Sequence, residues 1–378
     1  MPAKPLIVGV DVRDLRVAKT GTKTYLEELC KAFKKLDNTE VVFHFLDSNF
    51  PIYQGSKKIV KLFEHVNYQL WKQFTLPLKA WFKNCDVVFC TDNFVPLIHL
   101  GYQTIPVFHD AFFFENPENY GKLWLWLYKK TALPAAKKSP FVITPTFYAK
   151  QQIQKFTSIS AKQLVVVYEG IKTLSATTNL PPQKTLERFS LTPASYILHV
   201  GSMFKRKNLP TVITAFSRIK SLGYPNSKLV LAGSVPSSKT ENDHQKIIET
   251  ISNTNLQNEV ILTGYLTDNE LNVLYQNALM YVFPSINEGF GLPILEAFAN
   301  DLPVLVADNT CLPEVGGDAV LTFDPFDTDA VFTAIKTVLD NPDLRKEMIS
   351  KGRQRLADFS WLKTASEIVE VFKKSVNE

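Results

Sequence analysis

Two carboxylates flank a glycine loop in the segment from Glu288 to Glu296, Glu-Gly-Phe-Gly-Leu-Pro-Ile-Leu-Glu. The apolar run from Leu279 to Phe283 predicts a short strand before it, and Pro293 suits a first helical position because its missing N–H costs nothing there. The unpaired N–H groups of a first helical turn, with the helix dipole, favour an anion such as a diphosphate, and glycines let the backbone approach it. Both glutamates can accept hydrogen bonds from paired sugar hydroxyls. The segment therefore predicts a site that binds a sugar and a phosphate together.

A second candidate is the basic turn from Gly201 to Asn208, Gly-Ser-Met-Phe-Lys-Arg-Lys-Asn, which follows a predicted strand from Tyr196 to Val200. The adjacent cations Arg206 and Lys207 can neutralise a leaving diphosphate, because fixed cations stabilise charge as it develops. An isolated basic turn is usually a solvated surface feature. Its place at a strand end, before a predicted helix, favours the binding interpretation.

His109 and Asp110 close the apolar strand predicted from Ile105 to Phe108. A lone histidine is more often a satisfied polar residue than a functional one, so the strand-end position carries the argument. Asp110 is predicted to orient either His109 or the local loop.

The composition fits two folded domains. The chain has 378 residues with 45% hydrophobic content, and it is too long for one ordinary core. We find no run approaching the ~20 apolar residues that cross a bilayer and no signal peptide, which predicts a cytoplasmic protein. The four cysteines lack metal-site spacing and are predicted to be reduced and mostly buried.

Charge is shared unevenly along the chain. Residues 1–185 hold 24 Lys and Arg against 14 Asp and Glu, whereas residues 186–378 hold 18 against 23. Much of the N-terminal excess lies near aromatic residues, as in Trp71-Lys72 and Trp81-Phe82-Lys83. Such mixtures suit docking on an anionic membrane, but a solvated basic surface over ordinary core aromatics is an equally good interpretation. Nucleic-acid binding is disfavoured, because the basic residues are scattered and no readout module is recognised.

Apolar strand-like runs alternate with helical patterns along the whole chain, which indicates α/β domains with parallel sheets. We predict a first domain over 1–174, an interdomain linker over 175–190 and a second domain over 191–358, with a C-terminal helix over 359–378. Ligands of such sheets bind beyond the carboxyl ends of the strands. The pair Asp327 and Asp329 is interpreted as a helix N-cap rather than a metal motif.

The motif Asn287-Glu-Gly-Phe-Gly-Leu-Pro293 with Glu296-Ala297 resembles the donor site of retaining glycosyltransferases of family 4, which have the GT-B fold. The resemblance covers nearly the whole chain. It continues in Leu312-Pro-Glu-Val315, Leu274-Tyr275, Val200-Gly201, Arg206-Lys-Asn208, His109-Asp110 and Phe359-Ser-Trp361. Two departures are Asp301-Leu302, where the family usually has a glycine and a small residue, and a single glycine, Gly21, where it usually has two. The resemblance implies two doubly wound Rossmann-like domains that face each other across a cleft, with the last helix crossing back to the first domain.

The resemblance also implies roles for individual residues. His109 would contact the transferred sugar, Glu288 would lie near its hydroxyls, and Glu296 would bind the nucleotide ribose. The remaining donor-site residues would be the glycine turn Gly21 and Thr22, the phosphate ligands Gly201, Arg206 and Lys207, the nucleobase contacts Gly264 and Tyr265, and the loop residues Gly289, Phe290, Gly291 and Leu292.

The function expected from the resemblance is transfer of a hexose, with retention, from a nucleotide sugar to a growing lipid-linked glycan in polysaccharide or lipopolysaccharide biosynthesis. GDP-mannose is the preferred donor, and UDP-glucose or UDP-N-acetylglucosamine is the alternative. A catalytically silent sugar-nucleotide-binding partner is a second class of function, and sugar-nucleotide epimerases are disfavoured because the family-4 motif is complete. No metal and no cofactor beyond the donor are expected. A location in the cytoplasm, peripheral to the inner face of the cell membrane, would suit the lipid-linked acceptor.

Overall fold

The computed structural model describes residues 4–18, 21–48, 52, 58–172, 182–224, 227–236 and 241–377. The chain divides into two compact units, one of Met1–Gly170 with Phe359–Glu378 and one of Ile171–Asp358. No helix among the described residues is both long enough and apolar enough to cross a membrane.

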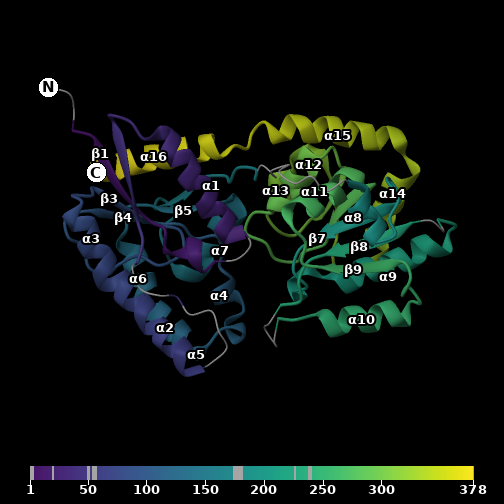
Figure 1. Cartoon of the computed structure of the whole chain (residues 1–378), viewed down its shortest axis with the longest axis horizontal. Coiled ribbons are helices and arrows are strands. Elements are labelled where there is room, and N and C mark those ends of the chain that lie inside the picture. Colours follow the sequence, from purple (N-terminus) through teal and green to yellow (C-terminus); the bar gives the residue numbers. More distant parts are fainter. Residues whose placement is uncertain are drawn as a thin grey trace. The chain divides into compact units, whose positions relative to one another are not determined.

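The first unit alternates strands and helices (Figure 1). Its strands are β1 (Leu6–Asp11), β2 (Val41–Leu46), β3 (Val87–Cys90), β4 (Gln103–Pro106), β5 (Val142–Thr144) and β6 (Leu164–Val166). Its helices are η1 (Arg13–Arg16), α1 (Gly21–Leu36), α2 (Lys58–Leu70), the π-helical η2 (Trp71–Thr75), α3 (Leu76–Phe82), α4 (Phe112–Glu115), η3 (Pro117–Asn119), α5 (Lys122–Lys130), α6 (Ala132–Lys138), α7 (Phe147–Thr157) and α16 (Trp361–Asn377).

The first sheet is parallel in the order β2-β1-β3-β4, and β5 pairs with β6 in parallel. A bridge between Val107 and Ile143 joins the two sets of strands. Every residue of β3 is buried, as expected for a parallel strand covered by helices on both faces. The order reverses between β1 and β3, so the carboxyl ends of these two strands form a topological switch point.

The second unit begins with α8 (Pro182–Arg188) and contains a six-stranded parallel sheet in the order β9-β8-β7-β10-β11-β12. Its strands are β7 (Tyr196–Val200), β8 (Lys228–Ala232), β9 (Val260–Gly264), β10 (Met280–Phe283), β11 (Val304–Ala307) and β12 (Val320–Phe323). Its other helices are η4 (Lys205–Lys207), α9 (Leu209–Ser221), α10 (His244–Asn253), α11 (Asp268–Asn277), α12 (Leu292–Ala299), α13 (Leu312–Gly316), η5 (Gly317–Ala319), α14 (Thr328–Asp340) and α15 (Pro342–Leu356). This is the Rossmann strand order, whose switch point lies between β7 and β10. The prediction of doubly wound Rossmann-like domains is confirmed.

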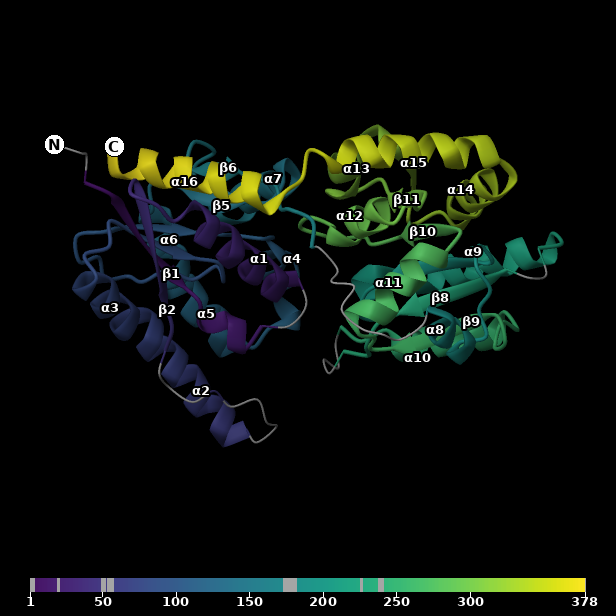
Figure 2. The ribbon, with the colours of Figure 1, turned by 45° about the horizontal axis from the view of Figure 1, so that its top comes forward.

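The C-terminal helix α16 packs against α1 of the first unit (Figure 2). The rings of Phe33 and Phe372 lie 6.2 Å apart across this contact, and both residues belong to the core of the first unit. A Cβ on Gly170 would lie 2.3 Å from the backbone nitrogen of Trp361, so the two ends of this unit touch where they enter and leave it.

The predicted domain boundaries differ from the units in detail. The division falls at Gly170 rather than at 174. Residues 175–181 of the predicted linker lie outside the described residues, and residues 182–188 form α8 of the second unit. Arg188 of α8 bonds to Glu270 of α11 at 2.6 Å. The prolines that indicated a linker include Pro182, which is the first residue of the helix and is favoured there.

Two local predictions concern caps and turns. Asp327 is the N-cap of α14 and accepts a hydrogen bond from the N–H of Asp329, as predicted. Asp301 takes the place of the family's glycine with a φ of 55°, so the turn keeps the left-handed conformation that glycine adopts easily. All four cysteines are free and buried, which confirms their prediction as reduced thiols.

Candidate functional site

The switch point of the second sheet brings together two loops that are about eighty residues apart in sequence. Strands β7 and β10 are hydrogen-bonded neighbours, and the loop after each leaves from the same edge of the sheet. The Ile286 N–H donates to the Arg206 carbonyl at 2.8 Å, which joins the two loops directly. This edge is where doubly wound sheets bind their ligands.

Glu288 holds both cations of the basic turn on one carboxylate oxygen. Arg206 and Lys207 donate to its Oε1 at 2.6 and 2.7 Å, and Arg206 also donates to the Asn287 carbonyl at 3.2 Å. The Lys207 side chain is 8% exposed and that of Glu288 is 12% exposed. The two predicted phosphate ligands and the predicted sugar ligand therefore form one charged cluster with a net charge of one positive unit.

The protonation of this cluster follows from burial and pairing. Burial works to raise the pKa of Glu288, but Arg206 and Lys207 outweigh it and keep that pKa below its ordinary value. Burial lowers the pKa of Lys207, and the neighbouring Arg206 lowers it further, while Glu288 opposes both. Glu288 is thus an ionised carboxylate that forms ion pairs with two cations.

The loop after β10 ends at a helix N-terminus without a side-chain cap. Helix α12 begins at Leu292, one residue before the predicted Pro293, and its N-cap is Gly291 with a φ of 106°. A Cβ on Gly291 would lie 2.8 Å from Leu312, so both conformation and packing require glycine there. Cys311 Sγ lies 3.2 Å from the carbonyl oxygens of both Glu288 and Phe290 and holds the loop.

Phe283, at the end of β10, lies next to both the basic turn and the start of α12. The Lys207 Nζ lies 4.6 Å from the centre of its ring, and a Cβ on Gly291 would lie 3.6 Å from its Cε1. Lys207 and an uncapped helix N-terminus therefore lie beside the same aromatic ring. Together they form an arrangement suited to an anion.

Glu296, further along α12, accepts a hydrogen bond from the Tyr275 hydroxyl at 2.9 Å. Burial raises the pKa of this carboxyl, although the Tyr275 hydrogen bond and Lys172 work in the opposite direction. Lys172 itself bonds to Asp268 at 2.7 Å. Glu296 therefore lies beside α11.

The carboxyl ends of β7, β8 and β9 meet through glycines. A Cβ on Gly233 would lie 2.0 Å from the Gly201 carbonyl oxygen, and the Gly233 N–H donates to the Gly264 carbonyl at 3.1 Å. Tyr265, which follows Gly264, is 79% exposed. The predicted residues Gly201, Gly264 and Tyr265 thus share one edge, and Gly233 completes it. The requirement for glycine at position 233 is visible only in the structure, where its backbone lies very close to that of Gly201.

His199 is a buried residue of β7 that the sequence did not single out. Its Nδ1 lies 3.0 Å from the Val282 carbonyl, and its Nε2 has no hydrogen-bond partner among the described residues. Burial, and then Lys207, lowers the pKa of His199 to about 3. The ring is therefore neutral, with Nδ1–H donating and Nε2 directed toward Gly201, whose ideal Cβ position is 3.3 Å away. A neutral ring next to Lys207 adds no positive charge to the cluster.

In the first unit, His109 follows β4 and is held at both ring nitrogens. Its Nε2 lies 3.0 Å from the Thr91 carbonyl and its Nδ1 lies 3.6 Å from Glu169 Oε1. The Tyr25 ring meets it edge-on, with ring centres 4.7 Å apart. Burial lowers the pKa of His109, but Glu169 and then Asp110 outweigh burial, so its pKa lies above 6.5. Oxygen atoms next to both ring nitrogens thus stabilise the protonated ring relative to an exposed histidine.

The partner of His109 is Glu169, which sequence reasoning missed. Asp110 accepts a hydrogen bond from the Phe112 N–H at 3.0 Å, so of its two predicted roles it takes that of ordering the local loop. Glu169 is 5% exposed and follows β6 by three residues. The available signal was a carboxylate directly after the apolar run from Leu164 to Tyr168, which the pattern predicts as a strand.

Replacing Glu169 by glutamine is expected to lower the pKa of His109, because burial remains while the main opposing carboxylate is lost. Because the pKa of His109 is raised in the folded state, protonation of its ring stabilises the fold at any pH below its unfolded-state pKa. This stabilisation is lost as the pH rises through the folded-state pKa. The His109 ring signals, titrated by NMR and assigned with His109→Gln, would show the fall. Glu40→Gln, an exposed site in the same unit, is the control, and an unchanged His109 titration in Glu169→Gln would contradict the pairing.

Gly21 and Thr22, the predicted glycine turn, form the first residues of α1. A Cβ on Gly21 would meet nothing within 4 Å among the described residues. Packing therefore does not require glycine at this position.

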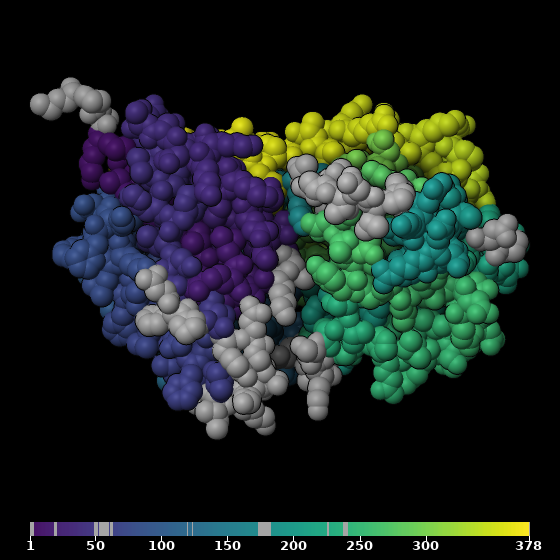
Figure 3. Space-filling view, in the orientation of Figure 1, coloured from purple at the N-terminus to yellow at the C-terminus, as the bar shows by residue number. Residues whose placement is uncertain are grey.

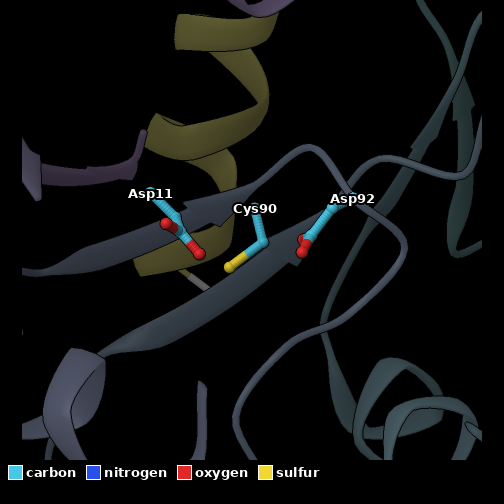
Figure 4. Close-up of side chains that lie close together, drawn as sticks. All are labelled: Asp11, Cys90 and Asp92. Carbon is cyan, nitrogen blue, oxygen red and sulfur yellow. The ribbon is translucent and has the colours of Figure 1, made fainter. Parts of the chain in front are cut away.

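A buried charged network occupies the switch point of the first sheet. Asp11 ends β1, and Cys90 and Asp92 lie at the end of β3, with their side chains directed toward one another (Figure 4). The Lys72 Nζ lies 2.6 Å from both Asp11 Oδ2 and Asp92 Oδ1. This lysine ammonium pairs with both carboxylates and offsets one of their two charges, and burial raises the pKa of the Cys90 thiol. The cluster therefore has a cation of its own, supplied by the chain.

Comparison with known families gives two matches that together span most of the chain. Residues 19–173 match "Glycosyltransferase Family 4", and residues 185–355 match "Glycosyl transferases group 1".

Individual proteins agree with this. O-antigen chain mannosyltransferase B of Escherichia coli is 26% identical over 294 residues, which are 76% of this chain and 74% of that protein. The serotype-specific mannosyltransferase WbdA of Escherichia coli is 27% identical over 285 residues, which are 74% of this chain and only 34% of WbdA. Among solved structures, sucrose-phosphate synthase from Thermosynechococcus elongatus has a TM-score of 0.73 at 18% identity, with 98% of each chain covered. That likeness shows the fold, which is GT-B.

Proposed function

The chain belongs to the group 1 and family 4 glycosyltransferases, a family that includes O-antigen mannosyltransferases, and on that premise we propose that it transfers mannose with retention from GDP-mannose to a growing, lipid-linked glycan. The observation that carries the proposal is the cluster of Arg206, Lys207 and Glu288 at the switch point of the second sheet. We assign the product to polysaccharide or lipopolysaccharide biosynthesis.

Arg206 and Lys207 bind the donor diphosphate and stabilise the charge that develops on it as the glycosidic bond breaks. They suit this role because Glu288 neutralises only one of the two cations, and the N-terminus of α12 adds its dipole. Gly201, Gly289, Phe290, Gly291 and Leu292 supply the close backbone around the diphosphate, and we also assign Gly21 and Thr22 to donor binding.

Glu296 binds the ribose hydroxyls of the nucleotide. Tyr275 donates to Oε2 and so fixes the carboxylate, while Lys172 lies close enough to lower its pKa. Gly264 and Tyr265 contact the nucleobase, with Tyr265 exposed at the carboxyl end of β9.

Glu288 and His109 act on the transferred sugar. Glu288 shares its charge with two cations, which makes it a poor covalent nucleophile, so we favour front-face attack by the acceptor through an ion-pair-like transition state. His109 contacts the sugar through its Nδ1–H. This nitrogen is the less tightly held of the two, because Glu169 lies 3.6 Å from Nδ1 whereas the Thr91 carbonyl lies 3.0 Å from Nε2. Retention follows from this pathway, because acceptor and leaving group share one face.

The acceptor is a lipid-linked glycan, and the protein works at the inner face of the cell membrane as a peripheral protein. The basic first half of the chain supports this location, with 24 basic against 14 acidic residues over 1–185. The reaction needs the donor and no further cofactor or metal.

A thermal-shift panel with GDP-mannose, UDP-glucose, UDP-N-acetylglucosamine and the free nucleoside diphosphates tests the donor. We expect stabilisation by the GDP series and a loss of affinity of about tenfold or more in Glu296→Gln, since hydrogen bonds to charged groups contribute about 1.5–3 kcal/mol. Glutamine keeps an acceptor for Tyr275. Glu249→Ala, on the exposed face of α10, is the control.

Each outcome of the panel has a meaning. Stabilisation by the UDP series alone would replace the donor with UDP-glucose or UDP-N-acetylglucosamine. Binding without any donor hydrolysis, with or without glycan acceptors, would favour a silent sugar-nucleotide-binding partner. No shift with any nucleotide would contradict the assigned donor site.

A further inference from the structure

One face of a long helical segment in the first unit exposes a continuous line of large apolar side chains. Helix α2, the π-helical η2 and α3 follow one another without a break, and they run as one rod in Figure 2. Phe63, Phe74 and Phe82 are 64%, 55% and 72% exposed. Between them lie further exposed side chains, namely Val66, Leu70, Leu78 and Trp81. These seven residues are the apolar stripe. Six of them, Phe63, Val66, Leu70, Phe74, Leu78 and Phe82, recur every three or four positions and so share one face of the helix, and Trp81 is next to Phe82.

The opposite face of the same segment is fixed to the sheet, so the apolar stripe cannot turn inward. Trp71 Nε1 donates to Asp11 at 3.1 Å, and Lys72 bridges Asp11 and Asp92. The Tyr68 hydroxyl donates to Asp92 at 2.6 Å. The π-helical turn places Trp71 and Lys72 together on the buried side while Leu70 and Phe74, on either side of them, stay exposed.

Positive charge accompanies the apolar stripe. Residues 58–83 contain five lysines and one acidic residue, Glu64, which pairs with Arg13, and residues 121–138 contain five lysines and no acidic residue. The two segments meet through Phe94, whose ring centre lies 5.4 Å from that of Tyr68 and 5.9 Å from that of Trp124. Trp126 of α5 is 57% exposed, near the exposed Lys122, Lys129 and Lys130. In the space-filling view, the blue surface of α2 and α3 lies at the outer margin of the first unit (Figure 3).

We propose that the apolar stripe, with Lys83 and the lysines of α5, docks this protein on an anionic phospholipid surface. This docking surface would hold the protein at the membrane, and the inference rests on the peripheral location in the proposed function. Exposed apolar side chains in a basic setting bury into the acyl boundary while lysines contact phosphates. A second copy of the chain fits less well, because it would bring two basic faces together.

Co-sedimentation of the full chain with vesicles tests the proposal. We expect binding to phosphatidylcholine vesicles that contain about 30% phosphatidylglycerol, weak binding to phosphatidylcholine alone, and loss of binding at high salt. The triple variant Phe63→Ser, Phe74→Ser, Phe82→Ser is expected to reduce the partition coefficient about a hundredfold or more. Removing Lys83, Lys129 or Lys130 is expected to reduce it about fivefold each. Phe326→Ser changes an equally exposed phenylalanine of the second unit and is expected to leave binding unchanged.

Nucleotide binding in the thermal-shift panel separates this proposal from the proposed function, because it needs no lipid. Wild-type protein that binds nucleotide but no vesicle would overturn the docking surface alone. Equal binding to neutral and anionic vesicles would also overturn it. A dimer in light scattering that the phenylalanine triple variant dissociates, without vesicle binding, would assign the stripe to a second copy instead. Tryptophan fluorescence in urea reports on the first unit, which holds all five tryptophans of the chain, and a cooperative unfolding transition in the triple variant shows that this unit is folded.

Discussion

Replacing Lys207 by methionine is expected to slow sugar transfer or donor hydrolysis by about 10²–10³-fold, the usual effect of removing one preorganised group that stabilises developing charge. Lys207 is buried, and its Nζ bonds to Glu288 beside Arg206. Methionine keeps most of the side-chain volume, and Glu288 keeps Arg206 as a partner. The loss should therefore reflect the missing cation rather than an unpaired buried charge. Release of nucleoside diphosphate from the donor that the panel identifies is the measurement.

The matched control is Lys205→Met, which removes the same charge from the same 3-10 turn at an exposed position. It is expected to change the rate less than twofold, because a solvated lysine contributes little to a buried transition state. A Lys207→Met enzyme within tenfold of wild type would contradict the role of this lysine on the leaving group. The wild-type rate should also fall on the alkaline side at a lower pH than an ordinary lysine would impose, since burial lowers the pKa of Lys207.

Replacing Lys72 by methionine is expected to destabilise the first unit by about 3–5 kcal/mol, because removal of one partner leaves buried charge uncompensated. Lys72 is 1% exposed and lies between Asp11 and Asp92. Burial already raises the pKa of Asp11 despite Lys72. The native state then binds more protons than the unfolded state, so the deficit should shrink as the pH falls through that raised pKa.

Tryptophan fluorescence in urea isolates this effect, since all five tryptophans of the chain lie in the first unit. Lys83→Met, at the exposed end of α3, should change the free energy of unfolding by less than about 0.5 kcal/mol. Adding Asp92→Asn to Lys72→Met should recover part of the loss by removing one of the two carboxylates. A deficit below about 1 kcal/mol for Lys72→Met would mean that water or another group compensates the two aspartates.

The fold and the donor half of the candidate site were largely predictable. Parallel strands covered on both faces appear as apolar runs, so the alternation of elements indicated two doubly wound domains. The segment from Glu288 to Glu296 combines strand end, loop and helix start within a few residues, and its local conformation follows from glycine and proline. The linker was the exception, because Pro182 starts a helix and the composition alone suggested a loop.

By itself the sequence determined the family, the Rossmann-like architecture of each domain and the loop residues after β7 and β10 of the second sheet. Only the tertiary structure decided which charges pair. Glu288 bonds to Arg206 and Lys207, and His109 meets Glu169 rather than Asp110. Lys72 is buried while Leu70 and Phe74 of the same helical segment are exposed. The physical reason is that tertiary packing sets the strand order, which brings distant loops to one edge of the sheet. Packing also decides which face of a helix is buried. A charge is stable inside the protein only beside its partner.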